Sequence, residues 1–182
     1  MLEPRKVSPR RSFASVITGF GAILTVVLVP MTALAAPGND SFHQPQRITS
    51  IPFTTTQSTE GATSELDEPF PSCAPIANTV WFRFRSTTNQ ELNANTYGSD
   101  FDTVISVYAG TTYPLPAAAA GNDDDSDCGD AGNLTSITPA FPVTAGQHYR
   151  VAVDGYKITS NATPVTHGNV RVMDMLPVIL EG

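Results

Sequence analysis

Acidic side chains gather in one short stretch of this 182-residue chain. Five of the eight positions from Asp123 to Asp130 are aspartate, and Asp124 and Asp125 are among them. Carboxylates crowded this closely repel one another, and a bound divalent cation relieves the repulsion. A flexible set of oxygen ligands suits Ca²⁺ better than a transition metal. The stretch therefore predicts a Ca²⁺ site, and the alternative is a solvated acidic loop that aids solubility.

This stretch does not complete an EF-hand. Its spacing begins like one, because Asp123, Asp125 and Asp127 occupy alternate positions. Cys128 then stands where an EF-hand has its turn glycine, and Leu134 stands where it has a bidentate glutamate. No helix is predicted on either side. We therefore reject an EF-hand and keep the two interpretations above.

Catalytic motifs are missing from the sequence. It contains no Gly-x-Ser-x-Gly, no His-Glu-x-x-His and no phosphate-binding loop. The three histidines, His43, His148 and His167, are not spaced like zinc ligands. We therefore expect a non-catalytic protein. The alternative is a small exported hydrolase, because two carboxylates far apart in sequence can still converge in a fold.

One aromatic side chain raises the question of ligand binding. In the alternating stretch 79–85, Trp81 shares a strand face with Arg83 and Arg85. These three residues could form a platform on which a sugar ring stacks. Large aromatic side chains are mostly buried, so we favour a tryptophan that is covered by the rest of the fold.

The first 35 residues carry the features of a secretory signal peptide. A basic start precedes an apolar run at residues 16–29, and Ala33-Leu-Ala35 matches a cleavage site. The apolar run is shorter than the ~20 residues of a membrane-spanning helix. The pair Arg10-Arg11 resembles a twin-arginine export motif, but we favour the general secretory route. We expect a bacterial protein that is secreted to the periplasm or the exterior, with no membrane attachment after cleavage.

Removal of the signal peptide makes the remaining chain, residues 36–182, strongly acidic. It keeps 6 of the 10 basic residues and 16 of the 17 acidic ones, which gives a net charge of −10. This balance argues against nucleic acid as a partner. Two cysteines remain, and in an oxidising compartment Cys73 and Cys128 predict one disulfide. Two free thiols are the alternative.

The pattern of residues 36–182 indicates strands throughout. Polar and apolar residues alternate at 79–85 and 147–154, and residues 102–108 are apolar on both faces, as in a central strand. Weaker strand patterns occur at 52–57, 91–96, 117–120, 135–141 and 168–173, and we expect 117–120 to be an edge or a loop. About eight short strands predict one all-β domain, an antiparallel β-sandwich or jelly roll.

Six segments, in order along the chain, match the landmarks of a known family. The most specific is 97–111, Tyr-Gly-Ser-Asp-Phe-Asp-Thr-Val-Ile-Ser-Val-Tyr-Ala-Gly-Thr. The others are residues 38–42, 59–63 with 68–69, 79–84, 121–124 and 144–155. Together they resemble the pre-peptidase C-terminal (PPC-like) β-sandwich domains of secreted bacterial proteins. We expect two departures from this family, a longer acidic loop and no attached catalytic domain.

The resemblance implies a non-catalytic module that binds or stabilises, in association with a surface, a polysaccharide or a secreted enzyme. A structural component of the cell envelope is a further alternative. Related sandwiches place the loop at residues 98–102 near the acidic loop. On that basis we expect one Ca²⁺ ion to share Asp100 or Asp102 with Asp123 and Asp124, and Asp125 lies beside them.

Overall fold

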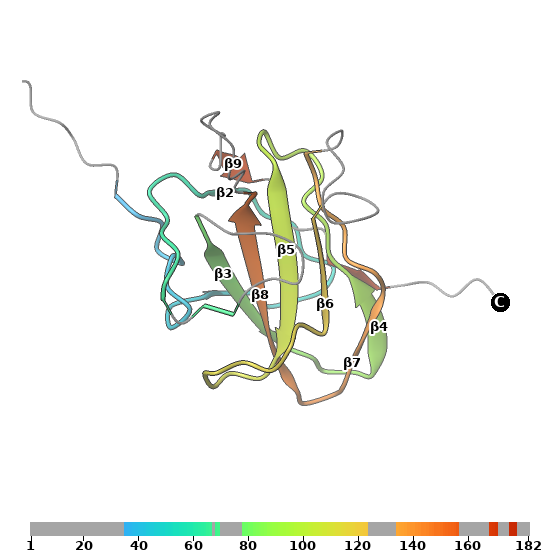
Figure 1. Cartoon of the computed structure of the whole chain (residues 1–182). Helices are drawn as coiled ribbons and strands as arrows, with labels where there is room; N and C mark the ends of the chain where they lie inside the picture. Colours follow the sequence, from blue (N-terminus) through green and yellow to red (C-terminus); the bar gives the residue numbers. More distant parts are fainter. Residues whose placement is uncertain are drawn as a thin grey trace, which may run out of the picture. The chain divides into compact units, whose positions relative to one another are not determined.

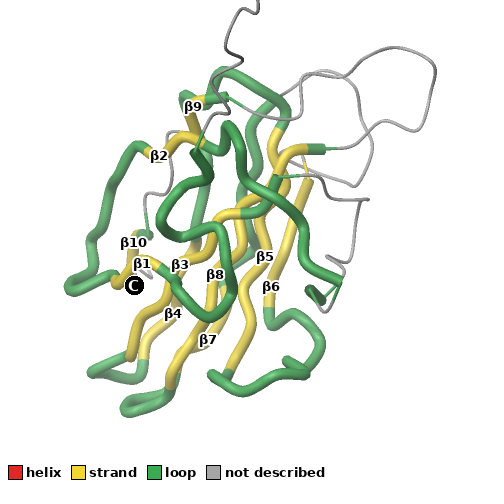
Figure 2. The backbone as a smooth tube through the Cα atoms, turned by 90° about the vertical axis from the view of Figure 1, so that its left-hand side faces the viewer, coloured by secondary structure: helices red, strands yellow, loops and turns green. Residues whose placement is uncertain are grey.

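The computed structural model describes residues 35–66, 68–69, 78–123, 134–156, 168–170 and 175–177, all within the compact unit Ala33–Gly182. These residues form strands and loops with no helix among them, as Figure 2 shows. The described part is therefore all-β, as the sequence predicts. None of its elements is a helix long and apolar enough to cross a membrane.

Ten strands are found in the described residues, and four of them contain only two residues. They are β1 (Gln46–Arg47), β2 (Gln57–Ser58), β3 (Val80–Arg85), β4 (Gln90–Asn93), β5 (Thr103–Ala109), β6 (Ala120–Asp123), β7 (Phe141–Val143), β8 (His148–Gly155), β9 (Asn169–Val170) and β10 (Leu176–Pro177). The three strongest sequence patterns correspond to β3, β8 and β5, each within one residue of its predicted bounds.

The larger sheet contains five strands in the order β1-β3-β8-β5-β6, and Figure 1 shows β3, β8, β5 and β6 side by side. Six of the seven residues of β5 are buried, which agrees with the central position that its apolar pattern predicts. Neighbouring strands run antiparallel except for β1 and β3, which are parallel. The expectation of a purely antiparallel fold is therefore wrong at this one pair.

A second sheet, in the order β10-β4-β7, forms the other layer. Apolar side chains from both sheets belong to a single buried cluster. From the larger sheet it takes Val80, Phe82, Phe84, Ile105, Val107, Tyr149, Val151 and Val153, and from the smaller sheet Leu92, Phe141 and Val143. The core thus lies between two layers, because each strand places alternate side chains on one face.

The opposite face of the larger sheet is covered over part of its area. A smaller apolar cluster there contains Phe42, Trp81, Tyr108, Leu115 and Ala152. Phe42 lies edge-on to Trp81, with ring centroids 5.2 Å apart. The N-terminal segment and the loop after β5 therefore cover the sheet around Trp81. Further along β3, Arg83 and Arg85 remain exposed on this same face.

Strand β6 differs from its predicted form. The sequence places an edge or loop at 117–120 and a loop at 121–124, whereas β6 spans Ala120–Asp123 at the edge of the larger sheet. Its pairing with β5 explains the difference, because the backbone hydrogen bonds of a ladder do not depend on strong strand formers. The backbone of Asp123 therefore belongs to a strand, opposite Val104.

Candidate functional site

The acidic residues of the predicted Ca²⁺ site fall partly within the described structure. Asp100 is exposed and Asp102 is half-buried, both just before β5. Asp123 ends β6 and pairs with Val104, so the start of β5 and the end of β6 are adjacent. Asp124 and Asp125 lie outside the described residues. Among those described, no group of three or more His, Cys, Asp or Glu side chains could hold a metal.

The two cysteines of the predicted disulfide, Cys73 and Cys128, also lie outside the described residues. Their pairing therefore stays a prediction.

Trp81 occupies the covered position and not that of a stacking platform. Its side chain is only 1% exposed. The indole Nε1 donates a hydrogen bond to Glu68 Oε1 at 2.9 Å. A ligand cannot reach the faces of a ring enclosed in this way, so Trp81 is removed from the predicted platform. Its two neighbours on the same strand face, Arg83 and Arg85, remain accessible.

Basic side chains line up across three adjacent strands. Arg47 of β1 pairs with Arg83 of β3, and Arg83 pairs with Arg150 of β8. One step further along, Arg85 pairs with His148. Residues opposite one another in a ladder lie on the same face of the sheet. Beside this row is a hollow of about 220 Å³ lined by Arg47, Arg83, Phe84, Arg85 and His148, which we call the arginine groove.

The positive charges of this groove are not neutralised within the described part of the chain. Arg47, Arg83 and Arg85 form no ion pair with a carboxylate of the described residues. Like charges directly opposite each other destabilise a sheet. A row of arginines in register is therefore a cost to folding, which a bound anion would offset.

Arg150 forms the inner end of the row. It is 7% exposed, and its Cζ lies 4.5 Å from the centre of the Phe42 ring, in a cation–π contact. Burial, and then the neighbouring charge of Arg83, lower the pKa of Arg150 below its usual value. Its Nε and Nη1 have no hydrogen-bond partner among the described residues. Both nitrogens are buried, and Arg150 does not line the hollow, so this guanidinium adds positive charge behind the groove and makes no direct contact with a ligand there.

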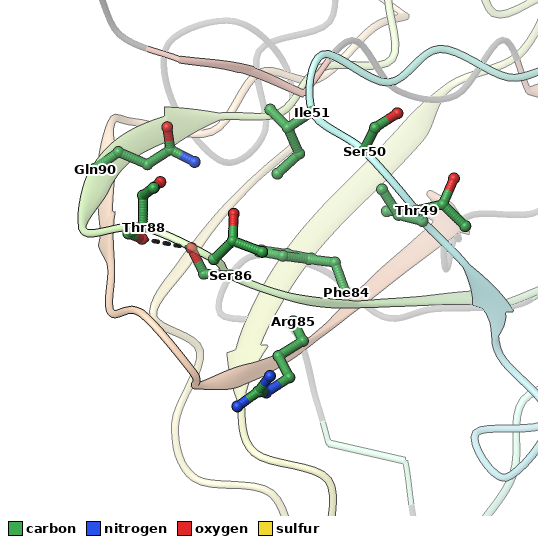
Figure 3. Close-up of a pocket in the computed structure, with 10 residues that line it drawn as sticks. Thr49, Ser50, Ile51, Phe84, Arg85, Ser86, Thr88 and Gln90 are labelled. Atoms are coloured by element: carbon green, nitrogen blue, oxygen red, sulfur yellow. Dashed lines mark hydrogen bonds between the residues drawn. The ribbon is translucent and has the colours of Figure 1, made fainter.

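A second hollow, of about 160 Å³, adjoins the arginine groove, and Figure 3 shows the residues that line it. The two are neighbours because Phe84 and Arg85 line both. The second hollow, which we call the hydroxyl pocket, is lined by Ile48, Ile51, Phe84 and Arg85 and by the polar residues Thr49, Ser50, Ser86, Thr87, Thr88 and Gln90. Ser86 Oγ donates to the carbonyl oxygen of Thr88 at 2.6 Å, as Figure 3 shows. The pocket thus offers neutral hydrogen-bonding groups beside a row of cations.

Two carboxyl groups are buried under the covered half of the same sheet face. Glu68 is 7% exposed and Asp154 is 2% exposed. The hydroxyl of Thr79 lies within hydrogen-bond distance of both, at 2.8 Å from Glu68 Oε2. Asp154 Oδ1 also accepts the backbone N–H groups of Asn78 and Gly155, at 3.0 and 2.7 Å. We call Glu68, Thr79, Trp81 and Asp154 the carboxyl cluster.

The number of hydrogens in this cluster favours a proton on one of the two carboxyl groups. A threonine hydroxyl has one hydrogen, which two ionised carboxylates would have to share, whereas a protonated carboxyl group can donate to the hydroxyl oxygen. Asp154 has two backbone donors, which suits the ionised form. Glu68 is then the protonated partner. In agreement, burial raises the pKa of Glu68 to about 7, against hydrogen bonds from Trp81 and Thr79 that lower it.

Sequence reasoning missed the carboxyl cluster and half of the arginine groove. Arg47 lies outside every predicted strand, so its pairing with Arg83 left no sign in the pattern. Two signals pointed to the cluster. A buried tryptophan needs an acceptor for its N–H group, and Asp154 ends an apolar strand pattern whose neighbours are buried.

A scan against protein-family models finds no match, and a search of curated proteins finds none either.

Proposed function

We propose that this chain is an exported, non-catalytic β-sandwich module with a binding or accessory role. The observation that carries the binding role is the arginine groove. Cations that stand in register on an open sheet face, with no ion-paired carboxylate among the described residues, weaken the fold, and a bound ligand would offset this cost. Export rests on the signal-peptide features of residues 1–35.

The resemblance to PPC-like domains, and with it a jelly-roll-like sandwich, is part of this proposal. Its support is the position of three resembling segments, 79–84, 97–111 and 144–155. They contain β3, β5 and β8, with β8 between the other two in one sheet. Three segments that are far apart in the chain, and that carry the resemblance, thus form neighbouring strands of the larger sheet. Such a module would associate with a surface, a polysaccharide or a secreted enzyme.

A stabilising Ca²⁺ ion is also part of the proposal. The pairing of β5 with β6 supports it, because it brings the segment that follows Asp102 next to Asp123. The described side chains do not make up a site alone, so the ion depends on Asp124 and Asp125 as well. Carboxylate oxygens from two adjacent strand ends are the ligands that Ca²⁺ prefers.

A small exported hydrolase is the alternative, and one observation favours it. Glu68, whose pKa is about 7, lines a hollow of about 400 Å³ together with Phe42, His43, Glu65 and Tyr113. A carboxyl group that titrates near neutral pH suits a general acid. Against this, both oxygens of Glu68 already bond to Trp81 and Thr79. That pattern is typical of a structural carboxyl group.

Binding and turnover measurements separate these classes. We expect the purified chain, with its N-terminus at Ala36, to be retained by a polysaccharide, a cell surface or a secreted enzyme, and to leave each ligand chemically unchanged. Turnover that survives stringent purification and is lost in Glu68→Gln would establish the hydrolase instead. A chain that is exported but retained by none of these would be a structural component of the envelope.

A further inference from the structure

The basic residues of this acidic chain are concentrated at one place. Only six follow Ala35, against sixteen acidic residues. Four of the six belong to the row or to the groove beside it: Arg47, Arg83, Arg85 and Arg150. Scattered basic residues would serve solubility equally well without repelling one another. Their concentration on one sheet face marks that face as a surface for an anionic ligand.

The chemistry of arginine indicates which kind of anion this surface would bind. All four are arginines, and the three that line the groove, Arg47, Arg83 and Arg85, have planar forks that can donate two parallel hydrogen bonds to a carboxylate. Partners on adjacent strands are about 5 Å apart, and Arg83 and Arg85 along one strand are about 7 Å apart. These separations suit a polymer with carboxylates at regular intervals. A single small anion would occupy only one end of the row.

The hydroxyl pocket indicates which class of carboxylate polymer would bind here. Its threonine and serine hydroxyls and the amide of Gln90 are neutral groups that both donate and accept hydrogen bonds. Sugar hydroxyls have the same double capacity. We propose that the arginine groove and the hydroxyl pocket together bind an acidic polysaccharide, with uronate carboxylates on the arginines and sugar hydroxyls in the pocket. This inference rests on the binding role proposed above and names its ligand class.

Overall charge favours a polysaccharide over nucleic acid. A nucleic acid has one phosphate per nucleotide and requires a broad basic face. The exported chain has a net charge of −10, so its surface outside the groove repels a polymer of such high charge density. An acidic polysaccharide has fewer charges and more hydroxyl groups along its length, which matches a short row of arginines beside a neutral pocket.

Affinity electrophoresis with two matched polymers tests the proposal. The purified chain is run through native gels containing polygalacturonate or its fully methyl-esterified form, in which the backbone is the same and the carboxylates are blocked. We expect retardation by the first polymer only. Arg83→Gln should weaken binding about tenfold, the loss expected for one charged hydrogen-bonding group. Arg83→Lys, which keeps the charge but not the fork, should restore only part of it.

A control variant separates a local effect from net charge. Ala140→Glu lowers the net charge by one, as Arg83→Gln does, at an exposed residue that lines neither hollow. We expect Ala140→Glu to bind like the unmodified chain. Thermal midpoints of both variants should not fall, because both positions are exposed.

Four results would overturn the inference. Three of them are equal retardation by the esterified polymer, equal weakening by Ala140→Glu, and equal binding of single-stranded DNA that depends on Arg83. Binding to a neutral glycan or to a secreted enzyme, unaffected by Arg83→Gln, would also overturn it and would leave the proposed accessory function intact. Hydrolysis of the polymer by the purified chain would instead refute the proposed non-catalytic function.

Discussion

Protonation of Glu68 makes the stability of this protein depend on pH near neutrality. The carboxyl group is buried, and the hydroxyl of Thr79 contacts it and Asp154 at once. Deprotonation puts a second negative charge into the cluster and leaves Thr79 with one hydrogen for two carboxylates. Besides Asp154, only Glu65 is a further charged group among those that raise the pKa of Glu68.

The magnitude follows from the two pKa values. Glu68 has a pKa of about 7 in the folded chain and an ordinary value of 4.5. The folded state therefore binds more protons between these values, so stability is complete below pH 4.5 and falls as the pH rises through 7. A difference of about 2.5 corresponds to about 3 kcal/mol. Screening by solvent reduces this, and we expect a loss of about 2 kcal/mol between pH 5 and pH 8.

Urea denaturation at pH 5 and pH 8, at constant ionic strength, measures this loss. Glu68→Gln should flatten the dependence, because an amide can accept from Trp81 and donate to Thr79 as the protonated acid does. The variant should therefore match the unmodified chain at pH 5 and exceed it at pH 8. Glu91→Gln, at an exposed carboxylate on β4, is the control and should keep the dependence. An equal loss in Glu68→Gln and the unmodified chain would refute the reasoning.

Three further predictions concern the cluster, the ion and the disulfide. Trp81→Phe should cost about 2 kcal/mol in urea denaturation, because it removes the N–H donor to Glu68 and leaves a buried acceptor; an unchanged midpoint would contradict this. Millimolar Ca²⁺ should raise the thermal midpoint, and Asp102→Asn should reduce the rise; no rise would count against the site. Thiol labelling of the denatured chain should find Cys73 and Cys128 protected until reduction, which should cost about 4 kcal/mol.

Strands that are long enough to show a clear polar and apolar pattern could be predicted from the sequence. Residues 79–85 alternate strictly, and residues 102–108 are apolar on both faces, so local composition alone indicates how many of their faces are buried. The structure confirms both as β3 and β5. Two-residue strands such as β1 have no periodicity to detect. They exist because a neighbouring strand offers backbone groups, and that neighbour is distant in the sequence.

The residues of the candidate sites also fall into those that the sequence pattern predicts and those that it does not. Arg83 and Arg85 were found because they stand two residues apart in one strand. Arg47 was not, because it reaches them only through the parallel pairing of β1 with β3. The carboxyl cluster joins Glu68 to Thr79 and Asp154, which lie 11 and 86 residues further along the chain. No spacing rule connects such residues, so only the folded structure brings them together.

The alternation of β3 explains why one sheet face holds two different environments. Trp81, Arg83 and Arg85 all point to the face away from the core, so the pattern alone treats them as equivalent. Phe42 breaks this equivalence, because its ring contacts both Trp81 and the Arg150 guanidinium. The N-terminal segment therefore sets the boundary at which the face changes from buried to exposed. The carboxyl cluster lies on its buried side, with Trp81, and the arginine groove lies on its open side.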